Sequence, residues 1–319
     1  MKFKNRFAKI RRRFYYYGAL AFAKSVSLIP YKLSVGFLSL FFGKVAYYCS
    51  YSAAKIAVKN LQKTFPNKSK KEIVKIAKTV FVNQARNFFE LANFPRINLG
   101  FLQSISSVEN KNLIEIALQK GKGLLFVSAH TGNWEITAAA VAALGLPVNV
   151  VAKKIYIDGL NDMLVKYRES KNVKVILKDA KDTGRKLLRA LKNGEIIAML
   201  IDQDTEVSGV FVDFFGQKAW TPSGLAVLAL KTGAEVLVGV DQRIGRYNHK
   251  TIIYGPVKIE TTGNVEIDVV TLTQKATSIL EEHIRICPEQ WVWFHKRWKT
   301  QSITRKLKDV SINSSSVVK

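Results

Sequence analysis

The sequence predicts an α/β fold in which a mixed, mostly parallel central sheet is flanked by helices, with an N-terminal membrane-associated helical region. Two observations over 113–286 predict the sheet. Short apolar runs alternate with helix-like segments, as they do where helices connect parallel strands. Gly121, Gly145 and Gly194 each stand where such a helix should end, just before a new apolar run. At 319 residues the chain can form one such domain with a terminal extension.

Residues 1–50 are predicted to anchor the chain to a membrane. Seven Lys and Arg side chains within the first 13 residues precede an aromatic run at 14–17, a combination typical of an anionic lipid interface, so membrane phospholipids are expected partners. Lys24, Pro30 and Lys32 divide the apolar part into pieces shorter than the roughly 20 residues of a bilayer span. We expect a monotopic helical hairpin in the interface, with a single span whose lysines snorkel as the alternative.

The domain assigned to 51–300 is predicted to begin with two amphipathic helices. Over 54–65 apolar side chains recur on one helical face, and lysines form a stripe on another. Ser69 and Glu72 have the spacing of a capping box, so a second helix should begin there. The polar segment 301–319 that follows the domain is expected to be a disordered tail.

The rest of the domain is read as alternating strands and helices. Strands are expected at 124–128, 148–152, 173–177, 196–201 and 235–240, and helices at 113–120, 136–144, 160–169, 182–192, 222–232 and 272–286. Residues 205–219 are expected to be a loop, 247–260 a hairpin, and Thr221 the cap of the helix that follows it. In an open α/β sheet of this kind, ligands bind at the carboxyl ends of the strands.

The segment 123–135 is the one around which the domain is organised. A buried strand ends in small residues and turns into a helix, which places His130 at the carboxyl edge of the sheet. Glu135 follows at a spacing that lets its carboxylate fold back onto one imidazole nitrogen and leave the other as a general base facing the cleft. The first N–H groups of the helix are expected to stabilise an oxyanion.

Four further polar or aromatic residues are candidates for substrate binding. Asn133 and Trp134 suit the first turn of a buried helix only where a polar group lies near the amide and a flat group lies near the indole ring. Asp202 and Gln203 follow the predicted strand 196–201. An acidic side chain at the end of an apolar strand costs free energy unless it is paired or has a functional role. The four His residues show no ligand-like spacing, so no metal is expected.

The composition restricts the partners of the chain. Fifty Lys and Arg residues against 24 Asp and Glu give a formal net charge of +26 and a pI near 10.0, which indicates an anionic partner. The cations are spread through the N-terminal helices and the Trp-rich segment 290–299, and the sequence carries no nucleic-acid-binding motif, so nucleic acid is not expected. A basic nucleic-acid- or membrane-binding protein without catalysis is kept as the alternative from another class.

Taken together, the motifs resemble the late (secondary) acyltransferases of lipid A biosynthesis, whose relatives include the phosphatidylinositol mannoside acyltransferases. The resemblance covers nearly the whole chain and rests on 60–61, 65–66, the His-x4-Glu segment 130–135, 202–203, 209–212, 214–216, 221–222 and 290–299. It implies a glycerolipid acyltransferase-like fold and transfer of an acyl chain from an acyl carrier protein or coenzyme A thioester, with no further cofactor. The implied acceptor is an anionic glycolipid at the cytoplasmic face of the bacterial inner membrane. A lipid A precursor is expected, and a phosphatidylinositol mannoside is the alternative.

The resemblance also implies roles for individual residues. It implies that His130 deprotonates the acceptor hydroxyl and that Glu135 orients the imidazole and stabilises its charge. Asn161 and Arg168 match an Asn and an Arg that the family places near the site. Transfer would then need no covalent acyl-enzyme, in agreement with the absence of a Gly-x-Ser-x-Gly motif from the sequence.

The match to the family departs at the expected phosphate contact. Shortly after the strand at 148–152, many family members carry Arg-Pro where this chain has Lys153, Lys154 and Ile155. We expect Lys154 to contact the acceptor as a point charge, without the planar fork of an arginine. Asp202 and Gln203 match a strand-end pair that we assign to positioning the acceptor.

Overall fold

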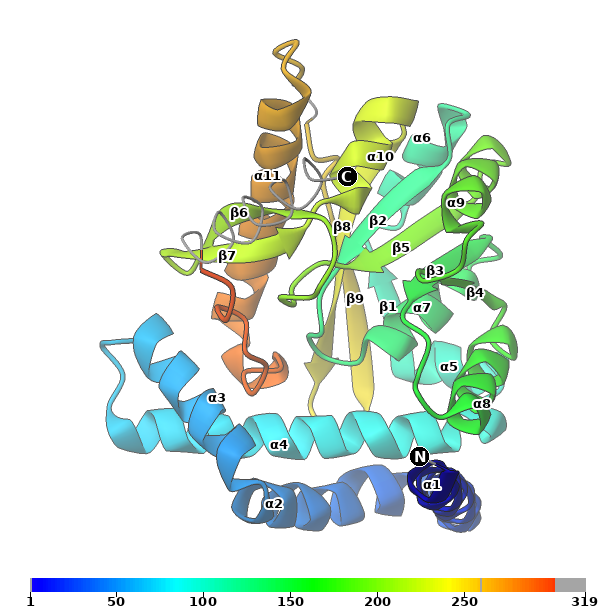
Figure 1. Cartoon of the computed structure of the whole chain (residues 1–319), viewed down its shortest axis with the longest axis vertical. Helices are drawn as coiled ribbons and strands as arrows, with labels where there is room; N and C mark the ends of the chain where they lie inside the picture. Colours follow the sequence, from blue (N-terminus) through cyan, green and yellow to red (C-terminus); the bar gives the residue numbers. More distant parts are fainter. Residues whose placement is uncertain (1, 259, 302–319) are drawn as a thin grey trace.

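A seven-stranded sheet forms the centre of the molecule (Figure 1). Its strands are β1 (Ser106–Glu109), β2 (Leu124–Ser128), β3 (Val148–Ala152), β4 (Val173–Leu177), β5 (Ile196–Leu200), β8 (Glu235–Ile244) and β9 (Asn248–Tyr254). The order is β1-β9-β8-β2-β5-β3-β4, in which β8, β2, β5, β3 and β4 run parallel and β9 is antiparallel to β8. The predicted mixed, mostly parallel sheet is confirmed.

The computed structural model describes residues 2–258 and 260–301, and of residues 2–10 it describes only the backbone. The expected polar tail therefore lies outside the described residues, apart from residue 301.

Helices cover both faces of the sheet (Figure 1). One face carries α6 (Asn112–Gln119), α7 (Trp134–Ala142) and α8 (Asp158–Glu169), and the other carries α9 (Thr183–Lys192), α10 (Gly224–Thr232) and α11 (Val265–Ile286). All five residues of β2 are buried, because alternate side chains enter the two apolar layers. Leu124 and Phe126 pack with α6 and α7, whereas Leu125 and Val127 pack with α9, α10 and α11.

The N-terminal helices lie against one long helix at the base of the sheet. They are α1 (Lys2–Leu28), the π-helix η1 (Leu33–Leu38), α2 (Ser39–Cys49), α3 (Tyr51–Thr64) and α4 (Lys70–Asn93). Helix α4 starts at the predicted capping box of Ser69 and Glu72, which is confirmed. Figure 1 shows α2 along α4 and α1 nearly end-on, so both pack on α4 and the expected helical hairpin does not form. Gly43 makes the close approach of α2 possible, since a Cβ there would stand 2.5 Å from the Cα of Val82.

Among the described helices, none is by itself long and apolar enough to cross a bilayer. The segments Leu33–Cys49 and Tyr51–Thr64 reach the required length and composition only together, and they bend by 91° at the break between them.

The structure differs from the predicted elements mainly in the second half of the chain. Residues expected to be a loop form the hairpin β6 (Gly209–Phe214) and β7 (Gln217–Pro222), so α10 begins after Ser223 and Thr221 is not its cap. The hairpin turn places Phe215 at φ 54° and Gly216 at φ 70°, and a Phe in this left-handed region is not the usual turn signal.

Three further differences concern short elements and a misplaced hairpin. The hairpin expected at 247–260 is formed by β8 and β9, because β8 runs on to Ile244. Strand β1 was not predicted. Short helices complete the chain: η2 (Phe94–Arg96), α5 (Leu99–Ile105) and η3 (Pro288–Gln290).

Candidate active site

His130 and Asp202 meet at the carboxyl edge of the sheet because their strands are neighbours. Strands β2 and β5 are parallel, and their register pairs Ser128 with Leu200. The same register, continued two residues beyond the strands, brings His130 level with Asp202. Oδ1 of Asp202 lies 2.8 Å from Nδ1 of His130, and Oδ2 accepts the backbone N–H of His130 at 2.9 Å.

Asp202 is a buried carboxylate with three hydrogen bonds. Besides the two from His130, Oδ2 accepts a bond from Nε1 of Trp291 at 2.7 Å. Burial alone would raise the pKa of Asp202, but the charge of His130 and these hydrogen bonds outweigh it and lower the pKa to about 2. An ionised carboxylate can only accept, so Nδ1 of His130 carries a proton. In the neutral imidazole Nε2 then holds the lone pair that a general base needs.

Glu135 pairs with Arg168 and not with His130. Its Oε2 accepts from Nε of Arg168 at 2.9 Å and its Oε1 from Nη2 at 2.6 Å, a bidentate ion pair. The expectation that Glu135 holds the imidazole is therefore wrong. Asn133 starts α7, which places Glu135 in the first turn of that helix opposite α8, while Asp202 already occupies Nδ1.

The ion pair keeps Arg168 charged. Burial alone would lower the pKa of Arg168, but the hydrogen bonds and the charge of Glu135 outweigh burial and raise it. A cationic guanidinium is therefore held in the wall of the cavity that His130 also lines.

Asn133 caps α7 and does not face a ligand. Its side chain is buried, and Oδ1 accepts the backbone N–H groups of Glu135 at 3.0 Å and Ile136 at 3.4 Å. Its Nδ2 donates to Oε2 of Glu90 at 2.7 Å. Neither the amide of Asn133 nor these two N–H groups are available to a substrate, so the expectation that Asn133 binds the substrate is wrong. The expected oxyanion site at the helix start stays a prediction, without the N–H groups of Glu135 and Ile136.

A cavity of about 660 Å³ opens beside His130. Trp134, Glu135, Arg168 and Gln203 line it together with His130 near the carboxyl ends of the strands. The remainder is mostly apolar, and its side chains include Phe126, Val141, Val148, Val150, Val175 and Ile196. Val148 and Ile196 are the first residues of β3 and β5, so the cavity follows the sheet for about 13 Å at 3.3 Å per residue. Such a volume is typical of a small-ligand site, and its shape and lining suit an apolar chain.

The structure brings three more predicted residues to this cavity. The ring of Trp134 stands edge-on to the imidazole of His130, with the centroids 4.7 Å apart. Asn161 is buried in the wall, where its Oδ1 accepts the backbone N–H of Ile155 at 3.2 Å. Gln203 lines the mouth. These residues are placed to contact a ligand in the cavity, as predicted, and their roles stay predictions.

Two other predicted binding residues lie elsewhere. Lys154 points to solvent and pairs with Asp158 at 2.9 Å, whereas its neighbour Lys153 lines the cavity. The cation that reaches the cavity is therefore Lys153, and the expectation that Lys154 contacts the acceptor is wrong. Asp202 lies behind His130 and outside the lining, so it is a partner of His130 and does not contact a ligand in the cavity, contrary to the expectation.

A buried charged cluster below the site was not predicted. It consists of Glu90, Asp241, Arg243 and His249, all of which are buried. The signal was present in the sequence, because Asp241 and Arg243 interrupt an apolar strand and Glu90 falls among the apolar positions of a helix. Charged residues at such positions are rarely buried unless they are paired.

Comparisons with known proteins agree with one another. A family model described as bacterial lipid A biosynthesis acyltransferase matches residues 1–300. A phosphatidylinositol mannoside acyltransferase of Mycolicibacterium smegmatis is 26% identical over 216 residues, which cover 67% of this chain and 69% of that protein. A lipid A biosynthesis lauroyltransferase of Escherichia coli K12 is 26% identical over 278 residues, 86% of each protein.

A solved structure is also similar. The 1-acyl-sn-glycerophosphate acyltransferase of Thermotoga maritima gives a TM-score of 0.32 at 17% identity, covering 76% of this chain and 93% of that one. At that score the resemblance bears on neither the site nor the acceptor.

The cap geometry predicts the effect of replacing Asn133. Asn133→Ala removes a helix cap, which lowers the free energy of unfolding by about 1 kcal/mol. It also removes the hydrogen bond from the Asn133 amide to the buried Glu90, which lowers the free energy of unfolding by about 1–3 kcal/mol more. Asn264 caps α11 in the same way, by accepting two backbone N–H groups, but it is exposed. Asn264→Ala should therefore lose only the roughly 1 kcal/mol of the cap. Urea denaturation followed by Trp fluorescence measures both unfolding free energies. Equal losses in the two variants would contradict the burial of the Asn133 amide against Glu90.

Proposed function

The chain belongs to the bacterial lipid A biosynthesis acyltransferase family, and from that premise we propose that it transfers a fatty acyl chain from a thioester to a hydroxyl of a lipid A precursor. Its relatives are acyltransferases, so the chain is an enzyme, and the alternative of a basic binding protein without catalysis is set aside. The observation that carries the proposal is the His130–Asp202 pair at the mouth of an apolar cavity.

The reaction follows from the hydrogen bonds of His130. Nε2 of His130 takes the proton of the acceptor hydroxyl while the hydroxyl oxygen attacks the thioester carbonyl. Asp202 stabilises the imidazolium that forms, because its carboxylate already accepts from Nδ1. The tetrahedral intermediate then expels the thiolate, which takes the proton back from His130. General base assistance of this kind contributes about 10²–10⁴-fold to the rate.

Arg168 is the group that we assign to the oxyanion. The backbone N–H groups of Glu135 and Ile136 are used by the cap of Asn133, which favours a charged side chain as the source of the stabilisation. Arg168 lines the cavity beside His130, and Glu135 holds its guanidinium at two points. Glu135 therefore acts in this mechanism by orienting Arg168. A preorganised charged donor in a partly buried site is the kind of group that stabilises a developing oxyanion.

The acyl chain of the donor is assigned to the apolar part of the cavity. The thioester carbonyl would lie between His130 and Arg168 while the chain extends toward Val148 and Ile196. The donor carrier is proposed to be acyl carrier protein or coenzyme A. No cofactor beyond this thioester co-substrate is proposed.

The acceptor is proposed to be an anionic glycolipid. Lys153, Arg168 and Lys178 place three cations in the lining, and the whole chain carries a formal charge of +26. Both features favour a phosphorylated sugar. Relatives acting on lipid A and on phosphatidylinositol mannoside support a glycolipid, and the match to a lauroyltransferase over 86% of both chains favours lipid A.

We propose that α1 and α2 seat the enzyme on the cytoplasmic face of the inner membrane. Large apolar and aromatic side chains are exposed on these helices and the turn between them: Phe14, Tyr15, Tyr17, Leu28, Leu33, Phe37, Phe41 and Tyr48. Exposed apolar and aromatic side chains on helices that also carry arginines are typical of an interfacial helix.

Helix α1 lies against the segment that leads out of the cavity wall. Arg12 of α1 donates to the hydroxyl of Tyr156, and its guanidinium stands 3.8 Å over the Tyr156 ring. Tyr156 directly follows Ile155, which lines the cavity together with Lys153. A lipid could therefore enter the site without leaving the membrane surface.

The proposed reaction predicts a definite product. Purified full-length protein in detergent, given acyl carrier protein and coenzyme A thioesters with a Kdo-bearing lipid A precursor, should add one acyl group, as measured by mass spectrometry. His130→Ala should abolish the addition, because the general base is lost. If the precursor stays unchanged while a phosphatidylinositol mannoside gains the acyl group, the alternative acceptor is correct. If no acceptor changes with any donor, the proposed function is wrong.

The cavity predicts how chain length is selected. Val141 lies in the wall about 10 Å along α7 from Trp134, so Val141→Phe should shorten the space for the acyl chain. The ratio of kcat/KM for long over short acyl thioesters should fall by about 10-fold or more. Val265→Phe is the control, since Val265 is exposed at the start of α11. An unchanged ratio in Val141→Phe would place the acyl chain elsewhere.

The exposed helices predict binding to lipid that survives salt. Wild-type protein should stay with vesicles of anionic phospholipid after a high-salt wash, because apolar contacts are not screened. Phe37→Glu combined with Phe41→Glu places two charges in the exposed face of η1 and α2 and should release the protein into the supernatant. Ile286→Glu, an exposed position on α11, is the matched control. Retention of the double variant would show that this face is not the anchor.

A further inference from the structure

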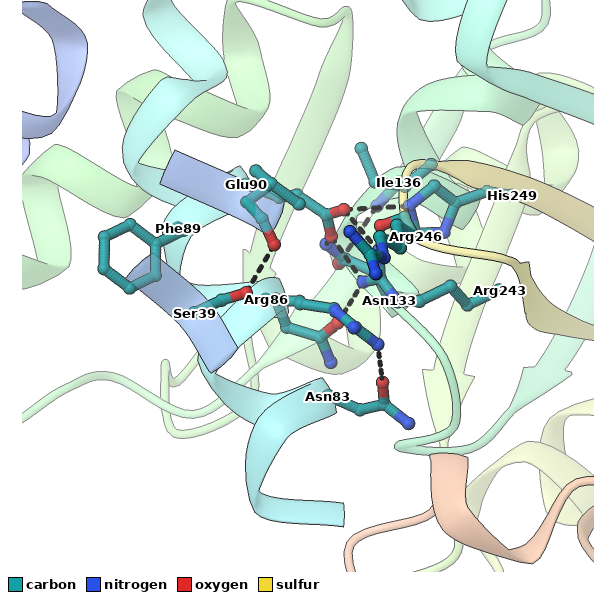
Figure 2. Close-up of polar contacts among 12 residues, drawn as sticks. Ser39, Asn83, Arg86, Phe89, Glu90, Asn133, Ile136, Arg243, Arg246 and His249 are labelled. Atoms are coloured by element: carbon teal, nitrogen blue, oxygen red, sulfur yellow. Dashed lines mark hydrogen bonds and ion pairs between the residues drawn. The ribbon is translucent and has the colours of Figure 1, made fainter. Parts of the chain in front are cut away.

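Four buried charged side chains lie next to the turn at 131–133. Figure 2 shows three of them, Glu90, Arg243 and His249, close to Asn133. Glu90 comes from α4, Asp241 and Arg243 from β8, and His249 from β9. None of them lines the cavity, and the proposed reaction does not use them. Buried charges are costly unless they are paired, so their arrangement calls for an explanation.

The four side chains form one paired network. Arg243 donates two hydrogen bonds to Glu90, from Nη1 to Oε1 at 2.5 Å and from Nη2 to Oε2 at 2.6 Å. His249 lies between the two acids, with Nε2 3.1 Å from Oε1 of Glu90 and Nδ1 2.7 Å from Oδ2 of Asp241. Burial alone would lower the pKa of His249, but Asp241 and Glu90 outweigh burial and raise it to about 9. With His249 protonated, two anions balance two cations.

The network ends on the turn at 131–133. Oδ2 of Asp241 accepts the backbone N–H of Asn133 at 2.7 Å, and Oε2 of Glu90 accepts from the Asn133 amide at 2.7 Å. Gly132 has φ 54°, and a Cβ there would stand 2.3 Å from Oδ2 of Asp241. The turn therefore packs directly on Asp241 at Gly132, which lies two residues after His130. Only a glycine fits at that position.

A second branch of the network reaches Asp202. The side chain of Gln290 pairs with the backbone of Arg243, through a bond of 2.7 Å to Oε1 and one of 3.0 Å from Nε2. The carbonyl of Gln290 accepts the N–H of Gly132 at 3.1 Å. The next residue, Trp291, donates to Asp202. The network thus touches the supports of both members of the His130–Asp202 pair.

We infer that Glu90, Asp241, Arg243 and His249 are positioning residues for His130 and Asp202. They act through the turn at 131–133 and through Gln290 and Trp291, without touching the substrate. The inference rests on the proposed function, in which His130 is the general base. Displacing a catalytic group by about 1 Å can cost about 10²-fold in rate, so a rigid support below the turn has a direct catalytic value.

Glu90→Gln is the variant that tests the inference. It keeps the size of the side chain but leaves Arg243 and His249 facing a single acid, Asp241. We expect kcat for acyl transfer to fall by about 10-fold or more while KM for donor and acceptor changes by less than about 3-fold, because the cavity is untouched. Arg243→Lys keeps the charge but loses the bidentate hydrogen bonding to Glu90. It should also lower kcat with little change in KM, by a smaller factor, and it replaces Glu90→Gln as the test if that variant does not fold.

A stability-matched control separates positioning from folding. Leu280 is buried in α11 on the other side of the sheet, so Leu280→Ala should lower Tm without lowering kcat. The inference is overturned if Glu90→Gln lowers Tm but keeps the wild-type kcat, or if Leu280→Ala loses as much kcat as Glu90→Gln. If wild type and His130→Ala are equally inactive, the proposed function falls and this inference falls with it.

The protonated His249 adds a dependence on pH. Glu90, Asp241 and Arg243 act on His249 directly, whereas Tyr31 and Arg86 face Glu90. A raised pKa means that the stability contributed by His249 is fully present below about pH 6.5 and is lost as the pH rises through about 9. The difference in unfolding free energy between wild type and His249→Gln should therefore shrink over that window. A constant difference would show that His249 is not the charged member of the network.

Discussion

The site depends on one constraint, the parallel register of β2 and β5. Hydrogen bonding between these strands fixes an offset of 72 residues, and the same offset separates His130 from Asp202. The pair therefore needs no special loop conformation to meet, since each residue follows its strand by two positions. The helices on both faces bury the two strands and so hold the register, because slippage by one residue would expose their apolar side chains.

Around this pair the protein separates charge from apolar space. Asp202 and the charged network of Glu90, Asp241, Arg243 and His249, which we propose orient His130, are buried outside the cavity lining, whereas the ion pair of Arg168 and Glu135 lines the cavity. The remainder of the cavity is largely apolar and follows the strands away from the mouth. An acceptor from the membrane and an acyl chain from the donor can then approach the imidazole from different directions, which is the geometry that direct transfer requires.

The sequence predicted the sheet and the position of His130, because apolar runs and glycine stops are local signals. It also placed Asp202 at a carboxyl edge, but it could not show that this edge adjoins that of His130, since strand order is not local. Glu135 was assigned to the imidazole from its spacing and from the family resemblance, but in the structure it lies in the first turn of α7 beside the Asn133 cap and pairs with Arg168. The charged network joins α4, β8 and β9, which only the folded chain brings together.

The central claim is that Asp202, and not Glu135, holds the imidazole of His130. The most direct measurement is proton NMR of the hydrogen-bonded Nδ1–H of His130 in protein labelled with ¹⁵N at histidine, which is feasible because the chain has four His. The account predicts a far-downfield signal that is absent from His130→Ala, disappears in Asp202→Asn and persists in Glu135→Gln. Loss of the signal in Glu135→Gln together with its survival in Asp202→Asn would contradict the account.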